Sequence, residues 1–204
     1  MTITGFLDTN ILVNWVFMDA ALQTPNADRR ELFDLLGRKV PSYKLLQRVK
    51  TDKELHGTLV TSHLAYAEIF TVLLDQYVED RMHAMGIPAS DFSRERLSVQ
   101  LTAVDATQIA KQITHLSNSY FREPNLLIRY VADEYDYVAF ASLIAAGRLQ
   151  TYDAILVATA LHEKCGYFIT EDTRLREAVK KLESELSITP ISAQAFSAKL
   201  PPEP

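Results

Sequence analysis

Short apolar runs alternate with longer segments of helical periodicity along most of the chain. Four of the runs, at residues 3–7, 58–61, 167–169 and 188–191, are too short for helices and are rich in branched and aromatic residues. Such runs are typical of strands in a parallel sheet that is covered by helices on both faces. The alternation therefore predicts an α/β protein, an α/β/α sandwich with a short, mainly parallel central sheet.

The longer segments predict the helices that cover this sheet. Apolar residues that recur every three or four positions predict helices at residues 11–17, 28–37, 42–50, 63–81, 105–120, 126–147, 154–164 and 171–186. Asn10, Ser62, Thr151 and Thr170 stand where the N-caps of four of these helices are expected. Residues 98–104 alternate between apolar and polar side chains, which predicts a further strand.

The composition is that of an ordinary globular chain, since 48% of the 204 residues are hydrophobic and 23% are charged. This length suits a single domain, which we place at residues 1–200 with a proline-rich tail at 201–204. The longest nearly apolar stretch, residues 138–147, is too short to span a membrane, and the first residues lack the pattern of a secretory signal. We therefore expect a cytoplasmic protein with no membrane partner.

The net charge of −5 argues mildly against nucleic-acid binding, because backbone phosphates are usually met by clustered Lys and Arg side chains. The argument weakens if several acidic residues share one metal site, because bound cations reverse the local field. The positions of the acids therefore matter more than their number. Cys165, the single cysteine, can form neither an internal disulfide nor a cysteine metal cluster.

Four acidic residues are expected at one edge of the predicted sheet. Asp8 ends the first strand, Asp153 lies in the first turn of a helix, and Asp172 follows the strand at 167–169. The carboxyl ends of parallel strands lie along one edge of a sheet, where ligands bind. Glu68 lies on the second turn of the helix after Ser62, close to the same edge.

Each of these acids also has a simpler structural interpretation. An aspartate at the end of a strand or the start of a helix commonly caps that helix, which stabilises it by about 0.5–1 kcal/mol, and Glu68 could be a half-exposed helix residue. The functional interpretation depends on convergence, because carboxylates around one crevice repel each other unless a cation neutralises them. Oxygen ligands suit Mg²⁺ or Mn²⁺, and acidic clusters that hold such ions recur in phosphodiester cleavage.

Four segments resemble, in order, the motifs of PIN-domain ribonucleases. They are residues 6–12 (FLDTNIL), 60–69 (VTSHLAYAEI), 151–160 (TYDAILVATA) and 168–172 (FITED). Residues 191–196 (ISAQAF) resemble the usual ending of that family. Within the family, the resemblance is greatest to the VapC-type toxins of bacterial and archaeal toxin–antitoxin pairs.

The resemblance implies a Mg²⁺- or Mn²⁺-dependent endoribonuclease that hydrolyses RNA phosphodiester bonds. It assigns both catalysis and metal binding to one set of carboxylates, namely Asp8, Glu68, Asp153 and Asp172. Polar neighbours would support the site, namely Asn10, Thr170 and, as a further acid outside the metal ligands, Glu171. Arg174 and Arg176, just after Asp172, are candidates for contacts with RNA.

The expected partners are the RNA substrate, a small VapB-type antitoxin and a second copy of the chain in a homodimer. The chain is longer than a typical toxin of this type. We interpret residues 120–148, which include the predicted helix at 126–147, as an inserted helical segment that covers one side of the site.

Two other functions remain open from the sequence. A non-catalytic PIN-like module could bind RNA or a protein through a degenerate site. A phosphatase of the haloacid-dehalogenase type also begins with an aspartate after its first strand. That chemistry requires a second aspartate two positions on, where this chain has Asn10.

Overall fold

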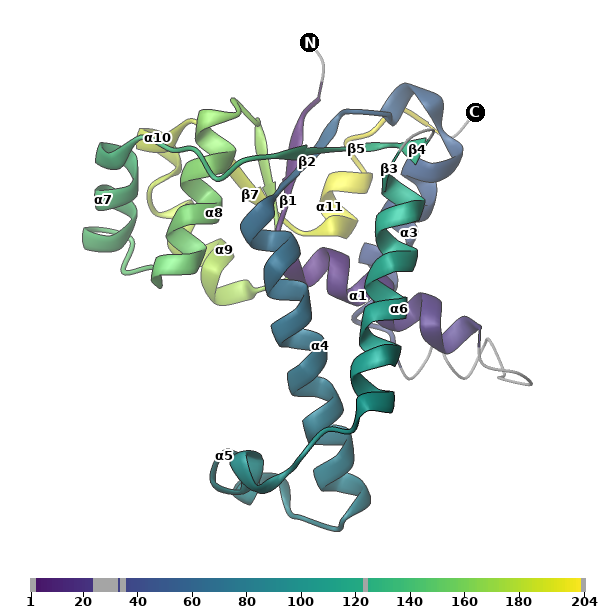
Figure 1. Ribbon diagram of the computed structural model, residues 1–204. Coiled ribbons are helices and arrows are strands. Elements are labelled where there is room, and N and C mark those ends of the chain that lie inside the picture. Colours follow the sequence, from purple (N-terminus) through teal and green to yellow (C-terminus); the bar gives the residue numbers. More distant parts are fainter. Residues whose placement is uncertain (1–2, 24–32, 34–35, 123–124, 203–204) are drawn as a thin grey trace.

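A five-stranded sheet forms the centre of the protein (Figure 1). The computed structural model describes residues 3–23, 33, 36–122 and 125–202. The strands lie in the order β5-β2-β1-β6-β7, and every neighbouring pair is parallel. They are β1 (Gly5–Leu7), β2 (Leu59–Ser62), β5 (Ile128–Val131), β6 (Tyr167–Ile169) and β7 (Thr189–Ile191). This confirms the predicted α/β class and the four predicted runs as strands.

Helices cover both faces of the sheet and make it the middle layer of an α/β/α sandwich. One face packs mainly against α1 (Thr9–Leu22), α3 (Val40–Thr51), α4 (His63–Ala84), α6 (Ala103–Tyr120) and α11 (Ala193–Ser197). The other face packs against α7 (Tyr137–Ala145), α8 (Thr151–His162), α9 (Thr173–Lys180) and α10 (Glu183–Leu186). Alternation along the strands divides the two cores: Leu7 faces the first and Phe6 faces the second.

The register between β1 and β6 brings two distant loops together. Leu7 pairs with Ile169, so the residues that follow each strand leave the sheet at the same edge. Phe6 stacks on Phe168 with 5.8 Å between the ring centroids. On the face of β1 that belongs to the first core, Gly5 leaves room for the side chains of Ile169 and Phe196, because a Cβ at that position would lie 2.6 Å from Cδ1 of Ile169.

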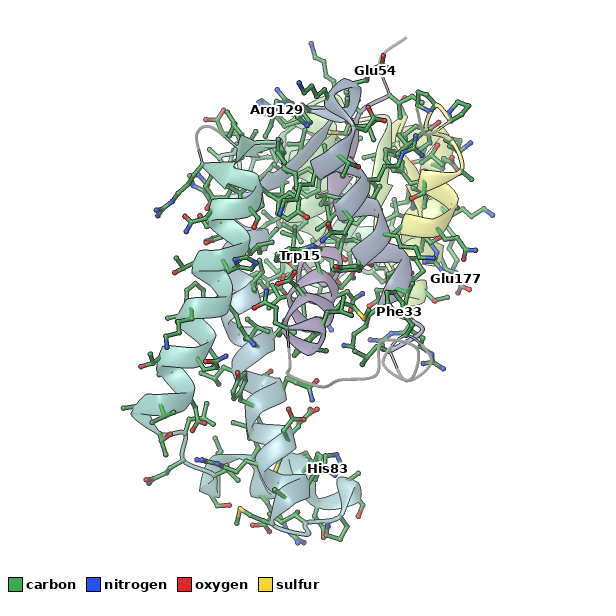
Figure 2. All side chains as sticks on the ribbon, turned by 90° about the vertical axis from the view of Figure 1, so that its right-hand side faces the viewer. Trp15, Phe33, Glu54, His83, Arg129 and Glu177 are labelled. Atoms are coloured by element: carbon green, nitrogen blue, oxygen red, sulfur yellow. The ribbon has the colours of Figure 1, made fainter. Side chains whose placement is uncertain are left out.

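Helices α4 and α6 extend beyond the sheet and form an arm with the segment that joins them (Figure 1). That segment contains η2 (Ala89–Asp91), α5 (Phe92–Glu95) and η3 (Arg96–Ser98). An ion pair between Arg81 of α4 and Asp105 of α6, 3.2 Å apart, links the two long helices. Figure 2 places His83 near the tip of the arm, whereas Trp15 lies in the body of the protein.

Two predicted elements are wrong. The strand predicted at 98–104 does not form; Thr102 is instead the N-cap of α6, in a capping box with Asp105. The helix predicted at 126–147 forms only from Tyr137, because residues 128–131 are strand β5. The segment taken as a helical insertion at 120–148 therefore supplies an edge strand of the central sheet, preceded by the short hairpin β3 (Phe121–Arg122) and β4 (Asn125–Leu126).

Several helix starts also differ from the prediction. Ser62 caps α4 as expected, but the N-caps of α1, α8 and α9 are Asp8, Gln150 and Asp172 rather than Asn10, Thr151 and Thr170. The segment predicted as one helix at 171–186 is divided into α9 and α10. Most of the helix predicted at 28–37 lies outside the described residues. A short helix, η1 (Lys53–Leu55), follows α3.

No helix in the described part of the chain combines the length and the apolar character that crossing a membrane requires.

Candidate functional site

The loops after β1 and β6 lie at the point where the sheet changes its winding direction. From β1 the chain continues to β2 on one side, whereas β6 pairs with β1 on the other side. At such a switch point the two connections leave in opposite directions, which opens a crevice at the carboxyl ends of the strands. Asp8 lies at the end of β1, and residues 170–172 follow β6.

Asp8 is buried and fully hydrogen-bonded at this edge, with 5% of its surface exposed. Its Oδ1 accepts from the backbone N–H of Thr9 at 2.7 Å, which makes Asp8 the N-cap of α1. Its Oδ2 accepts from the Thr170 hydroxyl at 2.6 Å and from the Asn10 side-chain amide. Both carboxylate oxygens therefore have partners, and the structural interpretation of Asp8 as a cap is correct as far as Oδ1 is concerned.

Asn10 and Thr170 join the two loops into one network. The Asn10 side chain donates to Thr170 Oγ1 at 2.9 Å and accepts from the Glu171 N–H at 3.0 Å. Thr170 Oγ1 also accepts from the Asp172 N–H at 3.0 Å, and this side chain is completely buried. These contacts fix the position of Asp8 relative to Asp172. Asn10 and Thr170 thus hold both acids in place.

Glu171 does not face the other acids. Its Oε1 accepts from the N–H of Ala193, at the start of α11, at 3.0 Å. Glu171 was predicted to support the site as a further acid. Its observed contact instead holds α11 against the β6–α9 loop.

Glu68, Asp153 and Asp172 complete the set of predicted carboxylates. Glu68 Oε2 accepts from the Thr9 hydroxyl at 2.6 Å, which links α4 to the start of α1. Asp172 is the N-cap of α9, since its Oδ1 accepts from the N–H groups of Arg174 and Leu175. Asp153, in the first turn of α8, makes no hydrogen bond to any described residue.

All four carboxylates line one cavity of about 290 Å³, which we call the carboxylate cavity. Its remaining lining comes mostly from one face of α1 and one face of α4, together with Lys39. Four of the lining residues were not predicted as site residues, namely Asn14, Phe17, Lys39 and Gln76. No local sequence pattern identifies them, because only tertiary packing brings them to the cavity. A larger hollow of about 470 Å³ lies between α1 and α6, but Asp19 is the one carboxylate among its described lining residues.

The electrostatics of the cavity favour a bound cation. Burial raises the pKa of Asp8 to about 7, although the Thr170 hydroxyl opposes this, and the charges of Glu68 and Asp153 raise it further. Burial also raises the pKa of Asp153 to about 6, with contributions from Glu68 and Asp172 and a smaller opposing effect of Arg174. The carboxylates therefore repel each other across the cavity and destabilise the ionised state.

The donor chemistry of the cavity fits a hard divalent cation, because its ionisable oxygens all come from carboxylates. Within the described residues, however, no three His, Cys, Asp or Glu side chains are close enough to hold an ion as they stand. Repulsion favours this spread arrangement, and a divalent cation would draw the side chains together. Among the described residues, nothing donates a hydrogen bond to Asp153, to Oδ2 of Asp172 or to Oε1 of Glu68, whereas both oxygens of Asp8 would have to be shared.

The two predicted RNA-contact residues are placed differently. Arg174 is exposed and lines a second hollow of about 260 Å³ with Arg148, which shares Asp153 and Asp172 with the carboxylate cavity. Arg176 is turned inward, since its guanidinium donates to the Thr170 carbonyl at 3.0 Å and to Thr173 Oγ1 at 3.3 Å. Arg174 thus remains available to a ligand, and Arg176 braces the β6–α9 loop.

Comparison with known proteins adds no relative, since neither a family model nor a curated protein sequence matches the chain. The interpretation of the site rests on its residues and on their arrangement.

Proposed function

We propose that the protein is a divalent-metal-dependent endoribonuclease whose active site is the carboxylate cavity. The observation that carries the proposal is the convergence of Asp8, Glu68, Asp153 and Asp172, from four separate segments, on one cavity at the switch point of a parallel sheet. A structural role explains Asp8 and Asp172 as caps, but it does not explain Asp153, which has no hydrogen-bond partner among the described residues and whose pKa is raised.

The residues of the site have separate tasks in this proposal. Mg²⁺ or Mn²⁺ would be held by Asp153, Glu68 and Asp172, through oxygens that accept no hydrogen bond from the described residues. The charge of Asp8 would add to the negative potential of the cavity. The bound ion would supply a more acidic water and stabilise charge on the attacked phosphate. Asn10 and Thr170 orient Asp8 by donating hydrogen bonds to its Oδ2, and the Thr170 hydroxyl opposes the rise in the pKa of Asp8 that burial causes. No protein nucleophile is required.

The contacts of Asp8 also argue against the phosphatase alternative. A nucleophilic aspartate needs an oxygen that is free to attack, whereas Asp8 is buried and both of its oxygens accept hydrogen bonds.

The test uses a circular single-stranded RNA, which has no ends for an exonuclease. We expect purified full-length protein to convert it to linear products with Mn²⁺ or Mg²⁺ and to be inactive with EDTA. Asp153→Asn should abolish cleavage, while the control Glu79→Gln, which removes an exposed charge on α4, should cleave normally. Cleavage by Asp153→Asn at the wild-type rate would refute the assignment.

A second candidate, a non-catalytic RNA-binding module, is favoured by two observations. Asp8 and Asp172 are both engaged as helix caps, and the described acids are not arranged as a ligand set. Binding of the RNA without cleavage, with Mn²⁺ present and over long incubation, would support this candidate and overturn the nuclease.

We further propose, from the motif resemblance, that the nuclease is the toxin of a pair with a VapB-type antitoxin and that it acts as a homodimer. Induced expression of the wild type in bacteria should then arrest growth, and Asp153→Asn should not. Sedimentation of the purified protein measures the dimer separately. Unimpaired growth with active wild-type enzyme present would remove the toxin role and leave the nuclease untouched.

A further inference from the structure

We propose that Lys39 binds a phosphate of the substrate strand at the far end of the carboxylate cavity, opposite Arg174, so that the strand is held on both sides of the carboxylates. This inference rests on the proposed nuclease function and adds a positioning residue that the sequence motifs do not contain. The arrangement of the cavity carries it in three steps.

The carboxylate cavity runs along two helices. Its lining residues on α1 follow one helical face, namely Thr9, Asn10, Val13, Asn14 and Phe17, and those on α4 are Glu68, Val72 and Gln76. Each set spans eight residue-to-residue steps, which corresponds to about 12 Å at 1.5 Å per residue. A stacked strand rises about 3.4 Å per nucleotide, so the cavity accommodates more than the one linkage that is cut.

Lys39 marks the end of the cavity that lies away from the sheet. Its backbone is fixed by the first turn of α3, where its carbonyl accepts from the Tyr43 N–H at 3.1 Å. Its Nζ lies 4.3 Å from the centroid of the Phe17 ring, at the end of the α1 face. The acid whose charge reaches the ammonium group is Asp80, further along α4, and no site carboxylate contributes. The acids and the lysine therefore occupy opposite ends.

The ammonium group of Lys39 has the features of an anion-binding group. Burial lowers its pKa, and no ion pair joins it to a residue in the described part of the chain. The charge of Asp80 compensates this burial only in part, because burial remains the larger effect on the pKa of Lys39, so the ammonium group gains from an anionic ligand. The Phe17 ring holds the ammonium group by a cation–π contact, which leaves its N–H groups able to donate to an anionic ligand.

Arg174 provides the second cation, on the other side of the carboxylates. It lines the neighbouring hollow that shares Asp153 and Asp172 with the carboxylate cavity, and its side chain is exposed. A strand that contacts both cations places a phosphate between them, next to the carboxylates. A grip on both sides favours cleavage inside a strand over removal of terminal nucleotides.

The experiment measures binding of a fluorescein-labelled single-stranded RNA by anisotropy, with Ca²⁺ as the ion and gel analysis to show that the RNA stays intact. For single strands the salt slope of log Kd changes by about 0.7 for each phosphate contact. Lys39→Ala should therefore weaken binding, and the ratio of its Kd to that of the wild type should fall about fivefold between about 50 and about 500 mM salt.

Matched variants separate a phosphate contact from a structural role. Lys39→Arg should restore the slope, Arg174→Ala should lose a similar amount, and the control Lys44→Ala, on an exposed position of α3, should match the wild type. A wild-type slope for Lys39→Ala, or a loss of affinity that is independent of salt, would overturn the inference while the nuclease stands. If wild-type protein neither binds nor cleaves RNA with any ion, the proposed function itself fails.

Discussion

Asp153→Asn should change the stability of the protein in opposite directions with and without a divalent ion. Asp153 is half-buried, it makes no hydrogen bond to a described residue, and its pKa of about 6 lies above the ordinary aspartate value of 3.8. The folded state therefore binds this proton more tightly than the unfolded state, and stability is lost as the pH rises from about 4 to about 6. The neutral amide removes that loss, so the metal-free variant should be the more stable protein at neutral pH.

The gain in unfolding free energy follows from the raised pKa of Asp153. The difference between about 6 and the ordinary 3.8 corresponds to about 3 kcal/mol as an upper bound, at 1.36 kcal/mol for each pKa unit. Because Asp153 is partly exposed and solvent screens its charge, we expect a gain of about 1–3 kcal/mol. For a chain of this size, 1 kcal/mol corresponds to about 2–4 °C in Tm. The metal-free variant should thus melt several degrees above the wild type at pH 7.5. The difference should shrink to a small fraction near pH 4, where the folded carboxyl is protonated and the unfolded carboxyl, with its ordinary pKa of 3.8, is partly protonated.

Thermal unfolding followed by circular dichroism tests this, in EDTA and in millimolar Mn²⁺, at pH 4, 5 and 7.5. Mn²⁺ should raise the Tm of the wild type, because an ion that binds the folded state stabilises it, and should leave Asp153→Asn nearly unchanged. Glu79→Gln controls for the loss of one negative charge. The electrostatic reasoning is refuted if metal-free Asp153→Asn is less stable than the wild type at pH 7.5, or if Mn²⁺ stabilises both equally.

Two further predictions concern the support of the site. Thr170→Val should destabilise the fold by about 1–3 kcal/mol in urea titrations, because it removes the hydroxyl that donates to Asp8 and accepts from Asn10 and the Asp172 N–H. Thr170→Ser should recover most of this loss. Equal stability of the two variants would show that the hydroxyl is dispensable. Gly5→Ala should cost about 1–3 kcal/mol by the same measurement, because its Cβ would lie 2.6 Å from Cδ1 of Ile169 and 3.0 Å from the Phe196 ring; a neutral effect would show that these two side chains shift without cost.

Local pattern was enough to predict most of the fold. The short apolar runs are parallel strands in the structure. A strand that is buried on both faces of a sheet appears in the sequence as a continuous apolar run, which can be recognised without knowing the neighbouring strand. The placement of Asp8 and of residues 170–172 at one edge also follows from their positions after β1 and β6, since parallel strands end together.

The prediction from local pattern failed where the same sequence pattern fits both a helix and a strand. Residues 128–131 carry apolar residues that fit a helix as well as a strand, and the pairing of Ile128 with Leu59 of β2 decides for the strand. Residues 98–104 alternate like a strand, but the capping box of Thr102 and Asp105 begins a helix within them. Helix starts shifted because Asp8 and Asp172 cap their own helices.

The amino-acid sequence alone determined which acids stand next to the strands and the helix starts, since the acids, their order and the strands that present them are local properties. Only the tertiary structure decided how those groups meet. It engaged Glu171 and Arg176 in other contacts, left Asp153 without a hydrogen bond to any described residue and brought Lys39 to the end of the cavity. The physical reason is that these contacts join residues far apart in the chain, and their geometry depends on how α1, α3 and α4 pack against the sheet.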